Sequence, residues 1–164
     1  MNRRREYIAM KYVDVEVVFR EIPDEITLAI SIPGCTIRCQ DCHSKYLWDD
    51  TGEELTTDAL NTVIEGNGGV SCICFMGGRF NELKKFLEFI RNNYPLLRTA
   101  WYTGESELPR YSGLLEMLDY IKIGPYIKDK GGLDSKGTNQ RMYEVISDKN
   151  GRRILNDITY KFQK

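Results

Sequence analysis

The stretch from Val70 to Phe75 is a short, continuous apolar run, and it constrains the fold more than any other segment of the chain. Such a run suits a strand that is buried on both faces, as in a parallel sheet covered by helices. Apolar residues recur at helical spacing on either side of it, at 57–65 and at about 81–93. The run therefore predicts a strand set between two helices.

The same alternation of patterns extends over the rest of the chain. A further helix is expected around 114–118, and further strands are expected at 13–19, 27–32, 99–102 and 120–123. Strands that alternate with helices predict right-handed βαβ units, whose ligands gather beyond the carboxyl ends of the strands. We expect one α/β domain over residues 1–164, with a lid at 128–137 and a closing strand within 153–162.

The charge pattern excludes several classes of function. The formal net charge is −1, and the one basic cluster, Arg3 to Arg5, lies at the end of the chain, so nucleic-acid binding is not expected. No apolar run approaches the roughly 18–20 residues that cross a bilayer, and no apolar segment typical of a signal peptide follows the arginines. We expect a cytoplasmic protein without a membrane partner.

The cysteines point to a metal centre. There are five, an odd number that argues against a disulfide framework, and Cys35, Cys39 and Cys42 have the spacing C-x3-C-x2-C. Thiols this close together can wrap one metal centre from a single loop. A 4Fe–4S cluster used only for electron transfer normally has four cysteine ligands, so three leave one iron open to another ligand. The spacing therefore favours an iron–sulfur cluster with an open site.

Structural zinc is the alternative interpretation of the same cysteines. It requires a fourth ligand, for which the candidates are His43, Cys72 and Cys74. His43 directly follows Cys42, and adjacent residues rarely chelate one ion from a loop without strain. Cys72 and Cys74 point to one face of an expected strand, where free cysteines usually pack as small apolar residues. Iron–sulfur binding is favoured over zinc on this basis.

At this point the chain resembles the radical S-adenosylmethionine superfamily, and within it the activating proteins of anaerobic (class III) ribonucleotide reductase. The match runs from about Ile30 to Arg141. It comprises the cysteine loop ending at His43, Trp48, Gly77-Gly78, Tyr102-Thr103-Gly104, Gly124-Pro125-Tyr126 and Thr138-Asn139-Gln140-Arg141. The cysteine spacing indicates the superfamily, and the last motif and the short chain narrow it to the activating proteins.

The resemblance implies a fold and an activity. The fold would be a shortened, open (β/α) barrel with a parallel sheet, a partial TIM barrel, whose gap a partner protein covers. The activity would be reductive cleavage of S-adenosylmethionine to methionine and a 5′-deoxyadenosyl radical, which abstracts hydrogen from a glycine of the reductase and leaves a glycyl radical. The partners would be this glycyl-radical subunit and a low-potential flavodoxin or ferredoxin as electron donor.

The resemblance also implies roles for individual residues. Cys35, Cys39 and Cys42 would bind the cluster. Gly77-Gly78 would offer backbone groups to the methionine amino group, and Asp41 and His43 would lie by the adenine. Tyr102-Thr103-Gly104 would either line the ribose pocket, through Thr103, or only turn the chain. The residues expected to contact S-adenosylmethionine are Asp41, Cys42, His43, Gly77, Gly78 and Thr103.

Two positions depart from the family pattern. Members commonly carry an acidic residue after the glycine pair, where this chain has Arg79. A guanidinium cannot pair with an amino group, so either backbone carbonyls, Glu82 or Asp41 take over that role, or binding of S-adenosylmethionine is weakened. Ile123 stands before Gly124 where many relatives have aspartate. These departures concern the pocket for S-adenosylmethionine and leave the cysteine motif unchanged.

Two other functions fit part of the pattern. A compact radical enzyme that acts directly on a small metabolite would use residues 128–137 as a substrate lid. A non-catalytic zinc-binding interaction domain would use the cysteines structurally, but it leaves Gly77-Gly78 and the gathering of motifs at strand ends without a role. The activating protein accounts for more of the sequence than either.

Overall fold

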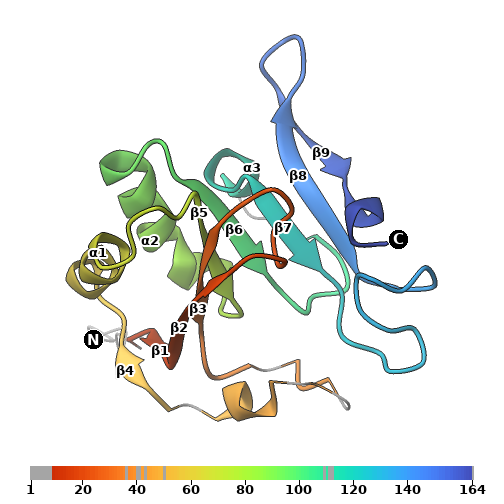
Figure 1. Ribbon diagram of the computed structural model, residues 1–164, viewed down its shortest axis with the longest axis horizontal. Helices are drawn as coiled ribbons and strands as arrows, with labels where there is room; N and C mark the ends of the chain where they lie inside the picture. Colours follow the sequence, from red (N-terminus) through yellow and green to blue (C-terminus); the bar gives the residue numbers. More distant parts are fainter. Residues whose placement is uncertain are drawn as a thin grey trace, which may run out of the picture.

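The computed structural model describes residues 9–35, 37–39, 42, 44–49, 51–108, 110 and 113–163 (Figure 1). Most of the strands in this part of the chain form one seven-stranded sheet. In sheet order these strands are β2 (Asp14–Val18), β3 (Thr27–Ser31), β5 (Cys72–Met76), β6 (Arg98–Tyr102), β7 (Tyr120–Ile123), β8 (Arg141–Ser147) and β9 (Arg153–Asp157). A separate two-stranded ladder pairs β1 (Lys11–Tyr12) with β4 (Glu53–Glu54).

The sheet is mixed, so the expected shortened (β/α) barrel with a parallel sheet is wrong. Strands β3, β5, β6 and β7 are parallel, whereas β2, β8 and β9 pair antiparallel with their neighbours. A parallel neighbour needs a long crossover, usually a helix. No helix lies between β2 and β3 or between β7 and β8, and a short turn joins β8 to β9, so these strands reverse direction.

One face of the sheet is covered by the helices α1 (Thr57–Glu65), α2 (Phe80–Asn93) and α3 (Leu114–Met117) (Figure 1). Helix α1 begins where the Thr56 hydroxyl accepts a 3.0 Å hydrogen bond from the Ala59 N–H, the contact by which a threonine caps a helix. Its buried residues and those of α2 pack on the strands in the larger core. That core includes Leu60, Ile64, Leu83, Phe86, Leu87, Ile90, Ile30, Ile73, Phe75, Trp101 and Ile121.

The other face of the sheet is covered without an α-helix. Ile22, from the connection between β2 and β3, and Ile158, before the 3₁₀ helix η2 (Thr159–Phe162), pack there in a second core. Cys72 and Cys74 belong to this core and are fully buried. Burial raises the pKa of both thiols, so they stay neutral and pack as small apolar side chains.

Asp119, just before β7, ties three elements together. Its carboxylate accepts a 2.9 Å hydrogen bond from the Thr99 N–H of β6 and lies 3.2 Å from Arg91 of α2 and 3.5 Å from Arg153 of β9. The aspartate side chain is only 13% exposed, so water screens these contacts weakly. The contact with Arg153 therefore adds a tie between β9 and the rest of the molecule to the pairing of β7 with β8. The turn between β8 and β9 extends beyond the other strands in Figure 1.

Two expectations about the carboxyl-terminal part need correction. Asn139, Gln140 and Arg141 have the polar pattern of a solvated loop outside any periodic segment, yet Gln140 is buried and Arg141 begins β8. The expected lid at 128–137 is tied to the molecule, because Leu133 lies in the second core and the Thr138 hydroxyl bonds the Gly131 carbonyl. The closing strand within 153–162 is confirmed as β9, followed by η2.

Within the described ranges, no helix is long and apolar enough to cross a membrane.

Candidate functional site

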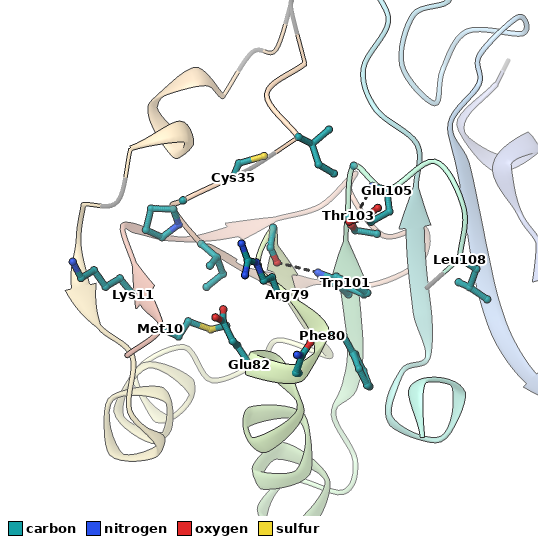
Figure 2. A pocket seen from close by; sticks show the side chains of 18 of the residues that line it. Met10, Lys11, Cys35, Arg79, Phe80, Glu82, Trp101, Thr103, Glu105 and Leu108 are labelled. Atoms are coloured by element: carbon teal, nitrogen blue, oxygen red, sulfur yellow. Dashed lines mark hydrogen bonds between the residues drawn. The ribbon is translucent and has the colours of Figure 1, made fainter. Parts of the chain in front are cut away.

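A large cavity opens at the carboxyl ends of the parallel strands. Its volume is about 1120 Å³, and Cys35, Gly77, Gly78 and Thr103 all contribute to its wall (Figure 2). Cys35 follows β3, the glycine pair follows β5 and Thr103 follows β6, so strand direction alone brings these residues to one edge. The structure thus gathers part of the predicted site from distant parts of the sequence.

The cysteine loop folds back on its own base. The N–H of Cys35 donates to the Leu47 carbonyl at 2.8 Å, and the N–H of Gly34 donates to the Asp49 carbonyl at 3.2 Å. These bonds close the loop through the 3₁₀ helix η1 (Lys45–Trp48). Inside the loop Arg38 has a left-handed φ of 49°, which turns the chain sharply between Cys35 and Cys39.

The loop is docked on the connection after β6. The side chain of Ile37 lies against Gly104 so closely that a Cβ built on Gly104 would stand 2.9 Å from Ile37 Cδ1 and 3.2 Å from Cγ2. Only glycine admits this approach without displacement of the isoleucine. The Tyr102-Thr103-Gly104 motif therefore positions the cysteine loop, a role that the sequence did not indicate.

Two of the three loop cysteines already accept backbone hydrogen bonds. The N–H of Tyr126 donates to Cys39 Sγ at 3.2 Å, and the N–H of Ser44 donates to Cys42 Sγ at 3.3 Å. Both bonds come from the backbone, so they orient the two side chains within the loop. The loop cysteines are half-buried, in contrast to Cys72 and Cys74.

Lys122 of β7 lies close to these sulfurs. Burial lowers the pKa of its ammonium group to about 8, and the charges of Cys39 and Cys42 partly oppose that shift. Its Nζ donates a 2.8 Å hydrogen bond to the Gly124 carbonyl. The motif analysis missed Lys122, although a single cation in the otherwise apolar strand 120–123 is the signal that marks it.

The cysteines fit a cluster by their chemistry more than by their placement. In the described part of the chain, no group of three or more His, Cys, Asp or Glu side chains is arranged to hold a metal ion. The donor set is nevertheless suitable, because three half-buried thiols share one loop and two of them accept N–H bonds. Asp41 and His43, expected by the adenine, lie outside the described residues.

The glycine pair has a backbone that other residues rarely adopt. Gly77 and Gly78 have φ values of 99° and 85°, and a Cβ on Gly77 would stand 3.1 Å from the Ile32 carbonyl oxygen. The Gly77 N–H donates to the Tyr102 carbonyl at 2.9 Å, and its carbonyl accepts from Trp101 Nε1 at 2.9 Å. The pair is therefore a rigid part of the cavity wall, and one carbonyl lone pair of Gly77 stays unused by these bonds.

Charged side chains of both signs line the cavity. Arg79, at the start of α2, is exposed, and Glu82 lies one turn further along the same helix (Figure 2). Glu105 lines the cavity after β6, where its N–H donates to the Thr103 hydroxyl at 3.2 Å. Glu82, which the sequence analysis considered as a substitute for the acid that relatives carry at position 79, is thus in the cavity wall.

No protein-family model matches this chain, and no curated protein sequence matches it. The resemblance to the activating proteins therefore depends on the sequence motifs alone.

Proposed function

We propose that this chain is a radical S-adenosylmethionine activating enzyme that installs a glycyl radical on an anaerobic ribonucleotide reductase. The observation that carries the proposal is the cavity shared by Cys35, Gly77, Gly78 and Thr103. A plain strand-to-helix turn at the glycine pair would have no reason to face a cysteine loop. The cavity has a volume of about 1120 Å³, which is ample for a nucleoside joined to an amino acid, since small-molecule pockets span roughly 300–1,000 Å³.

The charges of the cavity suit the methionine part of the ligand. An amino acid presents an ammonium and a carboxylate, and Glu82 and Arg79 offer the opposite charges from one end of α2. This arrangement would accommodate Arg79 at the position where relatives carry an acidic residue. The guanidinium takes the carboxylate, and the ammonium is left to Glu82 and the remaining lone pair of the Gly77 carbonyl.

The chain's own residues would bind and orient the cluster and S-adenosylmethionine, and they would exclude water from the site. Bound to Cys35, Cys39 and Cys42, a 4Fe–4S cluster would supply the electron that cleaves S-adenosylmethionine reductively. Ile37, Trp101 and Leu108 contribute apolar surface to the cavity wall, which keeps water from the reacting group. The rigid glycine pair fixes the ligand's amino-acid end relative to the cysteine loop.

The proposal includes the partners and the compartment. The glycyl-radical subunit of the reductase would dock over the open cavity, and a low-potential flavodoxin or ferredoxin would reduce the cluster. Both reactions belong in the reducing cytoplasm, where clustered thiols stay free to bind iron.

The test is anaerobic reconstitution with iron and sulfide, followed by metal analysis and electron paramagnetic resonance of the reduced protein with and without S-adenosylmethionine. The proposal requires a reduced cluster signal that changes on addition of S-adenosylmethionine, and a glycyl radical signal when the reductase is added. A colourless protein with one zinc would instead support the interaction domain. Cleavage of S-adenosylmethionine coupled to turnover of a metabolite, without the reductase, would support the small-molecule enzyme.

Matched cysteine variants make the test specific to the loop. Cys35→Ala, Cys39→Ala and Cys42→Ala should each abolish the signal. Cys74→Ala removes a thiol that is buried in the second core, so it should keep the iron content and the response to S-adenosylmethionine. Equal iron loss in Cys74→Ala and the loop variants would contradict the assignment of the ligands.

A further inference from the structure

The peptide group between Pro125 and Tyr126 joins the cysteine loop to the segment before β8. Its N–H, from Tyr126, donates to Cys39 Sγ at 3.2 Å. Its carbonyl, from Pro125, accepts a 3.0 Å hydrogen bond from Asn139 Nδ2. The peptide bond is trans, so the N–H and the carbonyl point in opposite directions. Asn139 and Cys39 therefore hold the two ends of one rigid dipole.

The neighbouring peptide group is held by the same segment. The Gly124 carbonyl accepts from Lys122 Nζ at 2.8 Å and from Gln140 Nε2 at 3.4 Å. Gly124 has a φ of 102°, and a Cβ on it would stand 3.0 Å from the Gln140 Cα. The chain thus packs two backbones against each other at this point, and Gln140 is only 6% exposed.

We propose that Asn139 is a positioning residue for the cluster, which acts through the Pro125–Tyr126 peptide group on the sulfur of Cys39. This inference depends on the proposed function, because it assumes that Cys39 is an iron ligand. Asn139 is not among the residues that line the cavity, and its amide bonds the Pro125 carbonyl.

The physical effect is on the reduction potential. A reduced cluster carries one more negative charge than the oxidised cluster, and an N–H dipole directed at a ligand sulfur stabilises that charge. The bond from Asn139 polarises the peptide group and strengthens its N–H as a donor. Loss of the Asn139 amide therefore loosens and weakens the Tyr126 bond, which shifts the potential to more negative values.

The experiment compares reconstituted wild type with Asn139→Ala and Gln140→Met by redox titration followed by electron paramagnetic resonance. The matched control is Asn67→Ala, because Asn67 is also half-buried and its Nδ2 donates to a carbonyl, that of Val63, at the end of α1. Gln140→Met removes the amide that steadies Gly124 and keeps the length of a buried side chain, so it tests the same peptide segment in a second way.

The expected result is unchanged iron content with a more negative midpoint potential in both test variants and no shift in Asn67→Ala. A tenfold smaller ratio of reduced to oxidised cluster corresponds to about 59 mV for this one-electron couple. Two outcomes would overturn the inference and leave the proposed function intact. One is a wild-type midpoint potential in both test variants, and the other is a lower iron content at an unchanged potential. A wild-type protein that binds zinc, or no iron, would overturn the proposed function as well.

Discussion

Trp101 and Gly77 are joined by a 2.9 Å hydrogen bond from the indole N–H to the glycine carbonyl, across two neighbouring strands. The indole is 2% exposed and its ring centroid lies 6.0 Å from that of Phe80. A core residue therefore fixes the peptide group that forms part of the cavity wall. This bond couples the stability of the core to the geometry of the candidate site.

Replacement of the indole tests that coupling. Trp101→Phe keeps an aromatic ring beside Phe80 but removes the donor, and it leaves the Gly77 carbonyl without this partner. We expect a loss of about 1–3 kcal/mol in the free energy of unfolding and weaker binding of S-adenosylmethionine, measured by chemical denaturation and calorimetry.

The control for this prediction is the other tryptophan of the chain. Trp48 Nε1 is buried and has no hydrogen-bond partner among the described residues, so Trp48→Phe removes an indole donor without breaking such a bond. A cost for Trp48→Phe as large as that for Trp101→Phe would show that ring size, and not the hydrogen bond, is responsible.

A second prediction concerns the close approach of Ile37 to Gly104. Gly104→Ala places a methyl group 2.9 Å from Ile37 Cδ1, and we expect the overpacking to cost about 1–3 kcal/mol of unfolding free energy. Ile37→Val removes Cδ1, so the double variant should recover part of that loss. Denaturation of the single and double variants measures the coupling. Strictly additive costs would contradict the docking of the cysteine loop at this position.

A third prediction uses the contrast between the two groups of cysteines. The pKa values of Cys72 and Cys74 are raised by burial, so these thiols remain protonated as the pH rises from 7 to about 9. Iodoacetamide, which attacks thiolates, should label only Cys35, Cys39 and Cys42 in the native metal-free protein over this range. Mass spectrometry of peptides after labelling checks this, and label on all cysteines is expected only after denaturation.

A fourth prediction concerns the carboxylate that ties β6, α2 and β9 together. Asp119→Asn removes the charge opposite Arg91 and Arg153, and we expect a loss of about 2 kcal/mol in unfolding free energy. Asp24→Asn is the matched control, because the Asp24 carboxylate is 82% exposed in its pair with Lys161 and should change stability by less than about 0.5 kcal/mol. Similar effects of the two substitutions would contradict the structural role of Asp119.

The elements with strong local patterns were predictable from the sequence. The apolar run at 70–75 became β5, and the helical patterns at 57–65 and 81–93 became α1 and α2, with boundaries that differ by at most a few residues. These patterns suffice because each element buries one continuous set of its own side chains. The parallel order β3, β5, β6 and β7 also follows, since helical connections leave a strand little other choice.

The sequence alone did not determine how the strands outside the parallel group pair. β2 and β8 have antiparallel partners because the connections next to them contain no helix, and β8 received no prediction at all. β8 lies between β7 and β9 in the sheet, and its buried residues, Met142 and Val145, do not follow a strict alternation that would mark a strand in the sequence. The expected barrel failed for this reason.

Some features of the candidate site were likewise set by the sequence, and others only by the tertiary structure. The sequence by itself determined the thiols of Cys35, Cys39 and Cys42 and the glycines that allow a positive φ at Gly77 and Gly78, because these properties belong to residue type and spacing. Only the tertiary structure decided that Ile37 packs on Gly104 and that the Pro125–Tyr126 peptide group reaches Cys39. Contacts between residues far apart in the chain form when the sheet brings strand ends together, and no local pattern records them.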